Sequence, residues 1–271
     1  MKTTVHTVAV RFALLTVAAS FGVSSLLGES NVPGAGSPPA GQGTPPAEGS
    51  PETAPAEAPA AAEKVEPPPK ILHYNRPKGS GSVAGRQSGG TRGSGEKLPL
   101  LAVLAPDHIA LTTQAQPALF WYQSEPSDAA FQITLTEPKK SKPLLSVTVD
   151  KAGNAGICNI LLRKQGVTLE PGVSYKWCVI LIPDRANRSR DFISTGEIKR
   201  IPVPAGLDAK LESATPAEKA VLYAEAGIWY DALQSITVAI AADPKSPALH
   251  SLRASLLAQA GLKEAAAADG K

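Results

Sequence analysis

Several features that usually signal enzymes, metalloproteins or nucleic-acid-binding proteins are scarce in this sequence. Its 271 residues include four histidines, and no two of them stand at the spacing of a metal-binding pair. Serine nucleophile motifs are missing, and the glycine-rich element at 85–95 lacks the lysine of a phosphate-binding loop. The formal net charge is only +3, whereas phosphate recognition usually needs a strongly basic face. The sequence therefore predicts no catalytic residue, metal or cofactor, and it argues against a nucleic-acid partner.

Large apolar residues are nearly absent between positions 30 and 97, where proline and glycine are crowded. A part rich in Pro, Ala and Glu precedes a part rich in Gly, Ser and Arg, and neither can bury enough apolar surface to offset the entropy of ordering. We therefore predict a long disordered linker over 30–97, semi-extended at first and then flexible. Its one apolar island, Ile71–Tyr74, is expected to dock on the domain that follows.

The first 29 residues have the pattern of an export signal. Lys2 and Arg11 precede an uncharged stretch at 12–28, as in secretory signals. Cleavage before Ser20 or near Gly28 fits this pattern. The alternative is an uncleaved anchor, because about seventeen uncharged residues are at the lower limit for crossing a bilayer. We expect a periplasmic or extracellular protein, or one held in the inner membrane by residues 12–28 and touching the membrane only there.

The two cysteines, Cys158 and Cys178, both lie in β-like runs of a chain that is expected to enter an oxidising compartment. A disulfide between them is predicted if their strands are neighbours and their Cβ atoms face one another. The alternative is two small side chains that are buried separately.

Residues 98–204 contain short runs of β-branched and aromatic residues, separated by turn signals at about ten-residue spacing. This pattern is typical of an antiparallel β-sandwich of immunoglobulin-like type. The run Phe131–Thr136 alternates apolar and polar residues, which predicts one buried and one wet face. The expected strands are Leu100–Leu104, Ile109–Thr113, Ala118–Gln123, Phe131–Thr136, Leu144–Val149, Ile157–Leu162, Ser174–Ile182 and Phe192–Ile201.

Residues 205–271 change to a helical period. Thr215, Pro216 and Glu218 form a capping-box pattern with proline at the first helical position. Small residues recur at a spacing of about 34, so that Gly227 corresponds to Gly261, which is the period of tetratricopeptide repeats. We predict a small helical hairpin of that type. Because it has fewer than the roughly three repeats that a free solenoid needs, its apolar face must be covered by the β domain or by a partner.

Five motifs together resemble the domain-of-unknown-function 928 family of bacterial exported proteins, over about residues 73–242. The resemblance implies an envelope-associated β domain fused to a helical hairpin, and it implies no particular activity. The motifs are Gly85–Gly95, Pro117–Tyr122, Pro171–Leu181, Arg188–Asp191 and Leu222–Leu233.

Two groups of residues are candidates for binding. Arg185, Arg188 and Arg190 follow a strong strand, and three guanidinium groups can hold a carboxylate or phosphate. Alternatively, Arg188 and Arg190 pair with neighbouring aspartates to fix the loop. Trp229 and Tyr230 are consecutive, so a helix points them about 100° apart, and we expect one in the hairpin seam and the other on the β domain.

The preferred function is therefore a non-catalytic binding or scaffolding module of the envelope. Its partner is expected to be another envelope protein or an anionic envelope component. The alternative is an enzyme of envelope polysaccharide or peptide metabolism that uses carboxylates such as Glu197 or Asp191.

Overall fold

The computed structural model describes residues 72–82, 87–88, 99–138, 140–150 and 154–270, all within one compact unit of the chain. The predicted signal at 1–29 and residues 30–71 of the predicted linker lie outside this part. None of the described helices is both long and apolar enough to cross a membrane.

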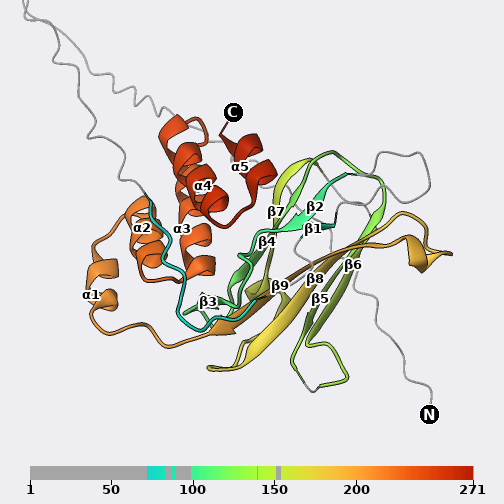
Figure 1. The fold of residues 1–271 in the computed structure, drawn as a ribbon, viewed down its shortest axis with the longest axis horizontal. Helices are drawn as coiled ribbons and strands as arrows, with labels where there is room; N and C mark the ends of the chain where they lie inside the picture. The colour runs from blue at the N-terminus through green and yellow to red at the C-terminus, as the bar shows by residue number, and fades with distance from the viewer. Residues whose placement is uncertain (1–71, 83–86, 89–98, 139, 151–153, 271) are drawn as a thin grey trace, which may run out of the picture. The chain divides into compact units, whose positions relative to one another are not determined.

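The described part is mainly β, with helices at its C-terminal end (Figure 1). The strands are β1 (Gln87–Ser88), β2 (Leu101–Val103), β3 (Ala110–Thr112), β4 (Ala118–Gln123), β5 (Ala130–Thr136), β6 (Leu145–Val149), β7 (Gly156–Leu161), β8 (Ser174–Ile182) and β9 (Phe192–Arg200). Short 3-10 helices η1 (Leu162–Gln165) and η2 (Arg188–Arg190) lie between strands. The α-helices are α1 (Leu207–Glu212), α2 (Pro216–Glu225), α3 (Trp229–Ala242), α4 (Pro247–Gln259) and α5 (Lys263–Asp269).

The strands form two sheets, in the orders β1-β2-β4-β7 and β3-β9-β8-β5-β6. All eight expected strands are present, and β4 and β8 have the expected bounds. Two expectations need correction. Strand β3 pairs in parallel with β9, which a purely antiparallel fold does not allow; these strands are far apart in sequence, so no tight hairpin joins them. Strand β1 lies inside the region predicted to be linker, and it pairs with β2.

The inner side of the five-stranded sheet is closely packed, and a hydrogen bond joins it to the four-stranded sheet. Trp177, on β8, is fully buried, and its ring occupies the space above Gly196 on β9. A Cβ at position 196 would lie 2.9 Å from the Trp177 Nε1, so only glycine fits under this ring. The amide of Val103 donates to the Ser194 hydroxyl at 2.8 Å and so connects β2 with β9 across the core.

The helices form two pairs, α2 with α3 and α4 with α5, preceded by the short α1. The predicted capping box is present: the Thr215 hydroxyl accepts from the Glu218 amide, and the Glu218 carboxylate accepts from the Thr215 amide. Gly227 and Gly261 end α2 and α4 in the same way, with φ of 75° and 76°. The alanine run Ala265–Ala268 lies in α5.

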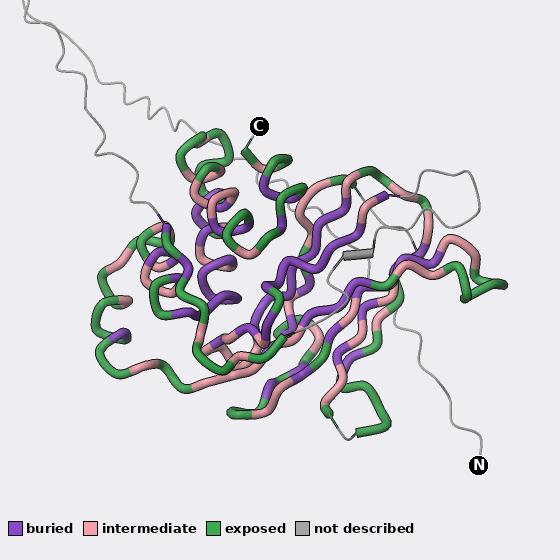
Figure 2. Tube along the Cα trace, in the orientation of Figure 1, coloured by how far each residue is buried: buried purple, intermediate pink, exposed green. Residues whose placement is uncertain are grey.

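Helix α3 joins the helical pairs to both sheets, because it packs against β3 and β4 (Figure 1). The Trp229 indole N–H donates to the Leu104 carbonyl at 2.8 Å, and the Tyr230 hydroxyl donates to the Glu197 carbonyl at 3.1 Å. Buried residues run without interruption from the middle strands into α3 (Figure 2). The sheets and the helices therefore share one hydrophobic core.

Residues 72–82 form an extended segment, called the strap below, that lies across the ends of α2 and α4 (Figure 1). Leu72 and Tyr74 are buried to 1% and 9% exposure, so the apolar island does dock, as expected. The strap contacts the helical pairs as well as the loop before β3, where the Ile109 amide donates to the Ser80 carbonyl at 2.9 Å.

Candidate functional site

The outer face of the five-stranded sheet, turned away from the other sheet, is the surface on which several of the predicted polar residues meet. In β8 the inward side chains Trp177 and Val179 are fully buried, so the intervening residues face outward. The strand register places Cys178 between Thr134 and Thr195 on this face. The helices pack instead against β4 and β7 of the four-stranded sheet and against the edge strand β3. The outer-face residues are Gln132, Thr134, Thr136, Ser146, Thr148, Lys176, Cys178, Ile180, Ile193, Thr195 and Glu197.

The predicted arginine loop lies at one end of this face, directly after β8. The Arg188 Nε donates to Asp191 at 2.6 Å, and its NH2 group donates to the Gln132 side chain on β5 at 3.1 Å. Arg185 forms an ion pair with Asp150. Arg188 thus pairs with the neighbouring Asp191, as in the alternative in which local acids fix the loop. Yet the Arg185 and Arg188 side chains remain 65% and 51% exposed, and Arg190 is exposed in the same turn.

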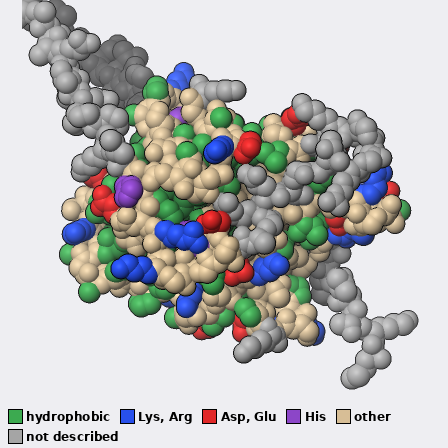
Figure 3. Space-filling view, viewed as in Figure 1, with side chains coloured by type: hydrophobic (Ala, Val, Ile, Leu, Met, Phe, Trp, Pro, Cys, Tyr) green, Lys and Arg blue, Asp and Glu red, His purple; other side chains and the backbone are tan. Residues whose placement is uncertain are grey.

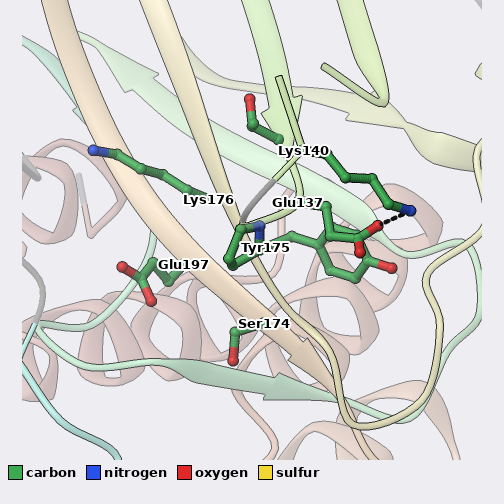
Figure 4. A pocket seen from close by; sticks show the side chains of 8 residues that line it. Glu137, Lys140, Ser174, Tyr175, Lys176 and Glu197 are labelled. Atoms are coloured by element: carbon green, nitrogen blue, oxygen red, sulfur yellow. Dashed lines mark ion pairs between the residues drawn. The ribbon is translucent and has the colours of Figure 1, made fainter. Parts of the chain in front are cut away.

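A polar pocket of about 390 Å³ lies at the other end of the face (Figure 4). Glu137 and Lys140 form an ion pair at 2.5 Å on one side, while Lys176 and Glu197 are opposite each other in the β8–β9 register on the other side. The hydrogen bond and charge of Glu137 raise the pKa of Lys140. The residues that line the pocket are mostly polar or charged, and they offer hydrogen-bonding groups of both signs of charge, while much of its exposed surface comes from their carbon atoms.

The two carboxylates named for an enzymatic role do not form a catalytic pair. Asp191 immediately precedes β9 and Glu197 lies within it. An extended strand rises about 3.3 Å per residue, so roughly 20 Å of strand separates them. Glycoside hydrolysis needs two carboxyl groups at about 5–10 Å. Moreover, Asp191 accepts a hydrogen bond from Arg188.

The cysteines lie on opposite sides of the five-stranded sheet, and both are free thiols. Cys158 stands opposite Trp121 in the four-stranded sheet, and the Trp121 ring faces Phe131 of the other sheet. Cys178 points outward from β8. The strand neighbourhood on which the predicted disulfide depended is therefore absent. Burial raises the pKa of the Cys158 thiol, which keeps it protonated.

Trp229 and Tyr230 form an internal contact rather than a surface site. Both are fully buried, and both bond to the β part, Trp229 to Leu104 just after β2 and Tyr230 to Glu197 in β9, whereas we expected only one to reach the β domain. The Tyr230 hydroxyl also accepts from the Trp177 indole at 2.8 Å. Burial raises the pKa of Tyr230, so its hydroxyl stays protonated and able to donate.

A second pocket, of about 310 Å³, lies where the strap meets the loop before β3 and the α4–α5 turn. In it, the Tyr74 hydroxyl lies 2.8 Å from the His108 Nε2, and the His108 Nδ1 lies 3.3 Å from Asp107. The hydrogen-bonded side chains of Tyr74, His108 and Asp107 resemble a proton relay. However, burial raises the pKa of Tyr74, so the phenol remains a donor and gains no nucleophilic character. We infer that these three side chains hold the strap in place.

Charge on the described surface is mixed. In Figure 3, lysine and arginine side chains are scattered among acidic ones on the visible face. Within the described ranges, no three His, Cys, Asp or Glu side chains are grouped so that they could hold a metal ion. We therefore expect a partner to be bound through individual arginines or polar strand residues, because this mixed surface does not create a broad electrostatic field.

Sequence reasoning missed the residues that assemble across strands. Lys176 and Glu197 come together only through the β8–β9 register, which the sequence alone does not provide. The alternation of Lys176 with Trp177 was the available signal for an outward side chain. Tyr74 and His108 come from the strap and the loop before β3, and no local pattern connects them.

Comparison with known proteins identifies a family. A family model described as Domain of Unknown Function (DUF928) matches residues 87–269. No curated protein matches the chain. Among solved structures, a multi-domain immunophilin from Arabidopsis thaliana aligns at 9% identity over 72% of this chain and 98% of that chain, with a TM-score of 0.15, too low to indicate a shared fold. Because the family model covers well over half of the chain, this protein belongs to the DUF928 family.

Proposed function

We propose that this chain is an exported bacterial envelope protein that acts as a rigid, non-catalytic binding module. The observation that carries the proposal is the core shared by helices and sheets, in which Trp229 and Tyr230 bond to backbone carbonyls of the β part. A module built in this way holds its outer surfaces in fixed positions. Such preorganisation favours binding, because little conformational entropy is lost when a partner attaches.

We propose the finer classes of fold on the same basis. Two sheets that face each other across a core fit an immunoglobulin-like sandwich. Two helix pairs with glycines at the corresponding positions 227 and 261 fit the tetratricopeptide type. The helix pairs need a cover, since two units do not bury their own apolar face, and α3 finds it on β3 and β4. This leaves the outer face of the five-stranded sheet as the surface for a partner.

The arginine loop supports an anionic component of the envelope as the partner. Arg185 and Arg188 are each held by one acid, and more than half of each side chain remains exposed. A guanidinium carries five N–H donors, so a carboxylate or phosphate can still bind to its outer edge. The acids orient the arginines without burying them.

The proposal is tested by co-sedimentation of the purified protein with carboxylate-rich envelope polysaccharide and with phosphate-rich vesicles. Changing Arg185, Arg188 and Arg190 to Gln should weaken binding by at least roughly tenfold, because three charged contacts are lost. The matched control changes Arg163 and Lys164 to Gln, which are exposed on η1. Equal binding by the loop variant and the control would refute the anionic site.

Export and the absence of catalysis need separate measurements. Fractionation of the bacterial cell should place the protein in the periplasm or outside the cell, and its intact mass should show cleavage before Ser20 or near Gly28. Recovery in the cytoplasm would reject export. Reproducible turnover of an ester, peptide or glycan that one substitution abolishes would reject a non-catalytic role.

A further inference from the structure

We propose that the seam between helices and sheets is a binding site for an extended peptide segment. Residues 72–77 of the strap fill this site within their own chain, and the same residues of a second copy fill it when chains exchange straps. The proposal rests on the contacts of the strap and is independent of export and of the arginine loop.

The site recognises the strap partly through its backbone. The Gln259 side chain, at the end of α4, accepts from the Tyr74 amide at 2.9 Å and donates to the Leu72 carbonyl at 2.8 Å. One carboxamide thus satisfies both polar groups of an extended chain, in the way that a neighbouring β-strand does. This contact needs an extended backbone but no particular side chain.

A second polar contact lies at the corresponding end of α2. The Asn75 amide donates to the Ala224 carbonyl at 3.1 Å, and the Asn75 side chain donates to the Glu225 carbonyl at 2.7 Å. These carbonyls belong to the last turn of α2, where carbonyls have no partner within the helix. The strap therefore caps α2 at the same time as α4 holds the strap.

Two side chains of the strap, Leu72 and Tyr74, give the site its preference for this peptide sequence. Leu72 is 1% exposed within the shared core. The Tyr74 ring makes an edge contact with Trp229 at 5.1 Å between centroids and stacks on His108 at 5.9 Å. Leucine and aromatic side chains gain much from burial in an apolar environment, so Leu72 and Tyr74 are the anchors.

The site is also shaped for close approach of a backbone. A Cβ at Gly227 would lie 2.6 Å from the Asn75 carbonyl oxygen and 3.1 Å from the Pro77 Cγ. Any side chain at position 227 would push the strap away. The glycine thus serves the strap as well as the left-handed turn after α2.

The same contacts are available to a second copy. The hydrogen-bond partners of Leu72, Tyr74 and Asn75 lie between 34 and 187 positions away along the chain, so none depends on local chain continuity. The sequence before the strap is rich in Pro, Ala and Glu and the sequence after it in Gly and Ser, and linkers of such composition allow exchange of a segment between copies. The chain's own strap competes at an effective concentration of about a millimolar, so exchange becomes appreciable when the protein is similarly concentrated.

The test uses two full-length variants with different tags. One carries a defective strap, through Leu72→Asp and Tyr74→Asp. The other carries a defective site, through Gly227→Leu. Mixed at high concentration, the intact strap of the second should enter the intact site of the first, and native mass spectrometry should show mixed dimers. Neither variant should form such dimers alone.

A synthetic peptide of residues 72–82 provides an independent measurement on the same protein. It should bind the strap-defective chain and raise its melting temperature, while a peptide carrying Leu72→Asp should bind at least roughly tenfold more weakly. If the doubly substituted chain does not fold, the chain with Leu72→Ala serves instead. The absence of both mixed dimers and peptide binding would overturn the proposal.

Discussion

Trp229 shows how one side chain can join two parts of a fold. Its ring fills the space between Tyr74 of the strap and the β part, and its N–H satisfies the Leu104 carbonyl. We predict that Trp229→Ala lowers the free energy of unfolding by about 3–5 kcal/mol, through lost burial and a cavity. Trp229→Phe retains most of the volume but leaves a buried carbonyl unpaired, which should cost about 1–3 kcal/mol. Urea denaturation of the three proteins measures both effects, and equal stability would contradict the assigned contact.

Asp231 is a fully buried carboxyl next to these aromatics, and it joins α3 to the end of β3. It accepts from the Thr113 amide at 3.1 Å and from the Thr113 hydroxyl at 2.6 Å. Burial raises the pKa of Asp231 above its ordinary value of 3.8, and the hydrogen bonds from the threonines oppose that rise only in part. The folded protein therefore holds this proton more tightly than the unfolded chain does.

The raised pKa of Asp231 predicts the direction in which the free energy of unfolding changes with pH. The contribution of protonated Asp231 is fully present below the ordinary pKa and is lost as pH rises through the higher pKa of the folded state. Asp231→Asn removes the titration and keeps a similar shape. The unfolding free energy of the native protein, minus that of Asp231→Asn, should therefore fall as pH increases above about 3.8. A difference that stays constant or rises over this range would contradict a raised pKa.

At the scale of elements, the strap makes a glycine indispensable. Gly227→Ala meets both an unfavourable φ and the backbone of Asn75 at 2.6 Å, whereas Gly166→Ala meets only an unfavourable φ of 65°, with no atom within 4 Å of the added Cβ. We expect Gly166→Ala to cost about 1–2 kcal/mol. Gly227→Ala should cost clearly more, because it also displaces the strap. Thermal unfolding of both variants measures the difference, and equal losses would mean that the strap does not press on this turn.

The strands were predictable from the sequence because their pattern is local. In β5, alternating Phe131, Gln132 and Ile133 already separate a buried from a wet face. The cap of α2 was predictable for the same reason, since Thr215 and Glu218 act within one turn. Strand β1 was not, because two residues in a Gly/Ser-rich stretch carry no periodic signal. The parallel pairing of β3 with β9 depends on long-range packing that no local pattern records.

In the candidate site, too, local features could be predicted from the sequence and long-range contacts could not. The arginine loop could be predicted because Arg188 and Asp191 are three positions apart and meet within one short turn. Its link to Gln132 crosses from η2 to β5, and the polar pocket brings Glu137 near Glu197, so both required the folded sheet. Trp229 and Tyr230 were expected to diverge, and they do. Both still reach the β part, because α3 lies within the shared core.

For the whole molecule, the order of layers explains which surfaces are available. The helices pack on the four-stranded sheet and on β3, while the five-stranded sheet faces the other sheet with its inner side. The strap connects the helix ends to the loop before β3 and so stabilises the contact from outside. Because aromatic residues, the strap and a shared core all cross between helices and sheets, neither part should unfold without the other.

Our last prediction is that helices and sheets unfold in a single transition, and two residues of α3 test it. Ile236 is fully buried, whereas Val238 is 51% exposed on the same helix. Ile236→Ala should cost about 2–5 kcal/mol through lost burial and a cavity, while Val238→Ala should change stability by less than about 0.5 kcal/mol. If the core is continuous, Ile236→Ala lowers the midpoint of the helical signal in circular dichroism and the midpoint for loss of amide-exchange protection in β5 and β8 by the same amount. A helical midpoint that falls while the midpoint for β5 and β8 stays unchanged would show that the helices unfold separately.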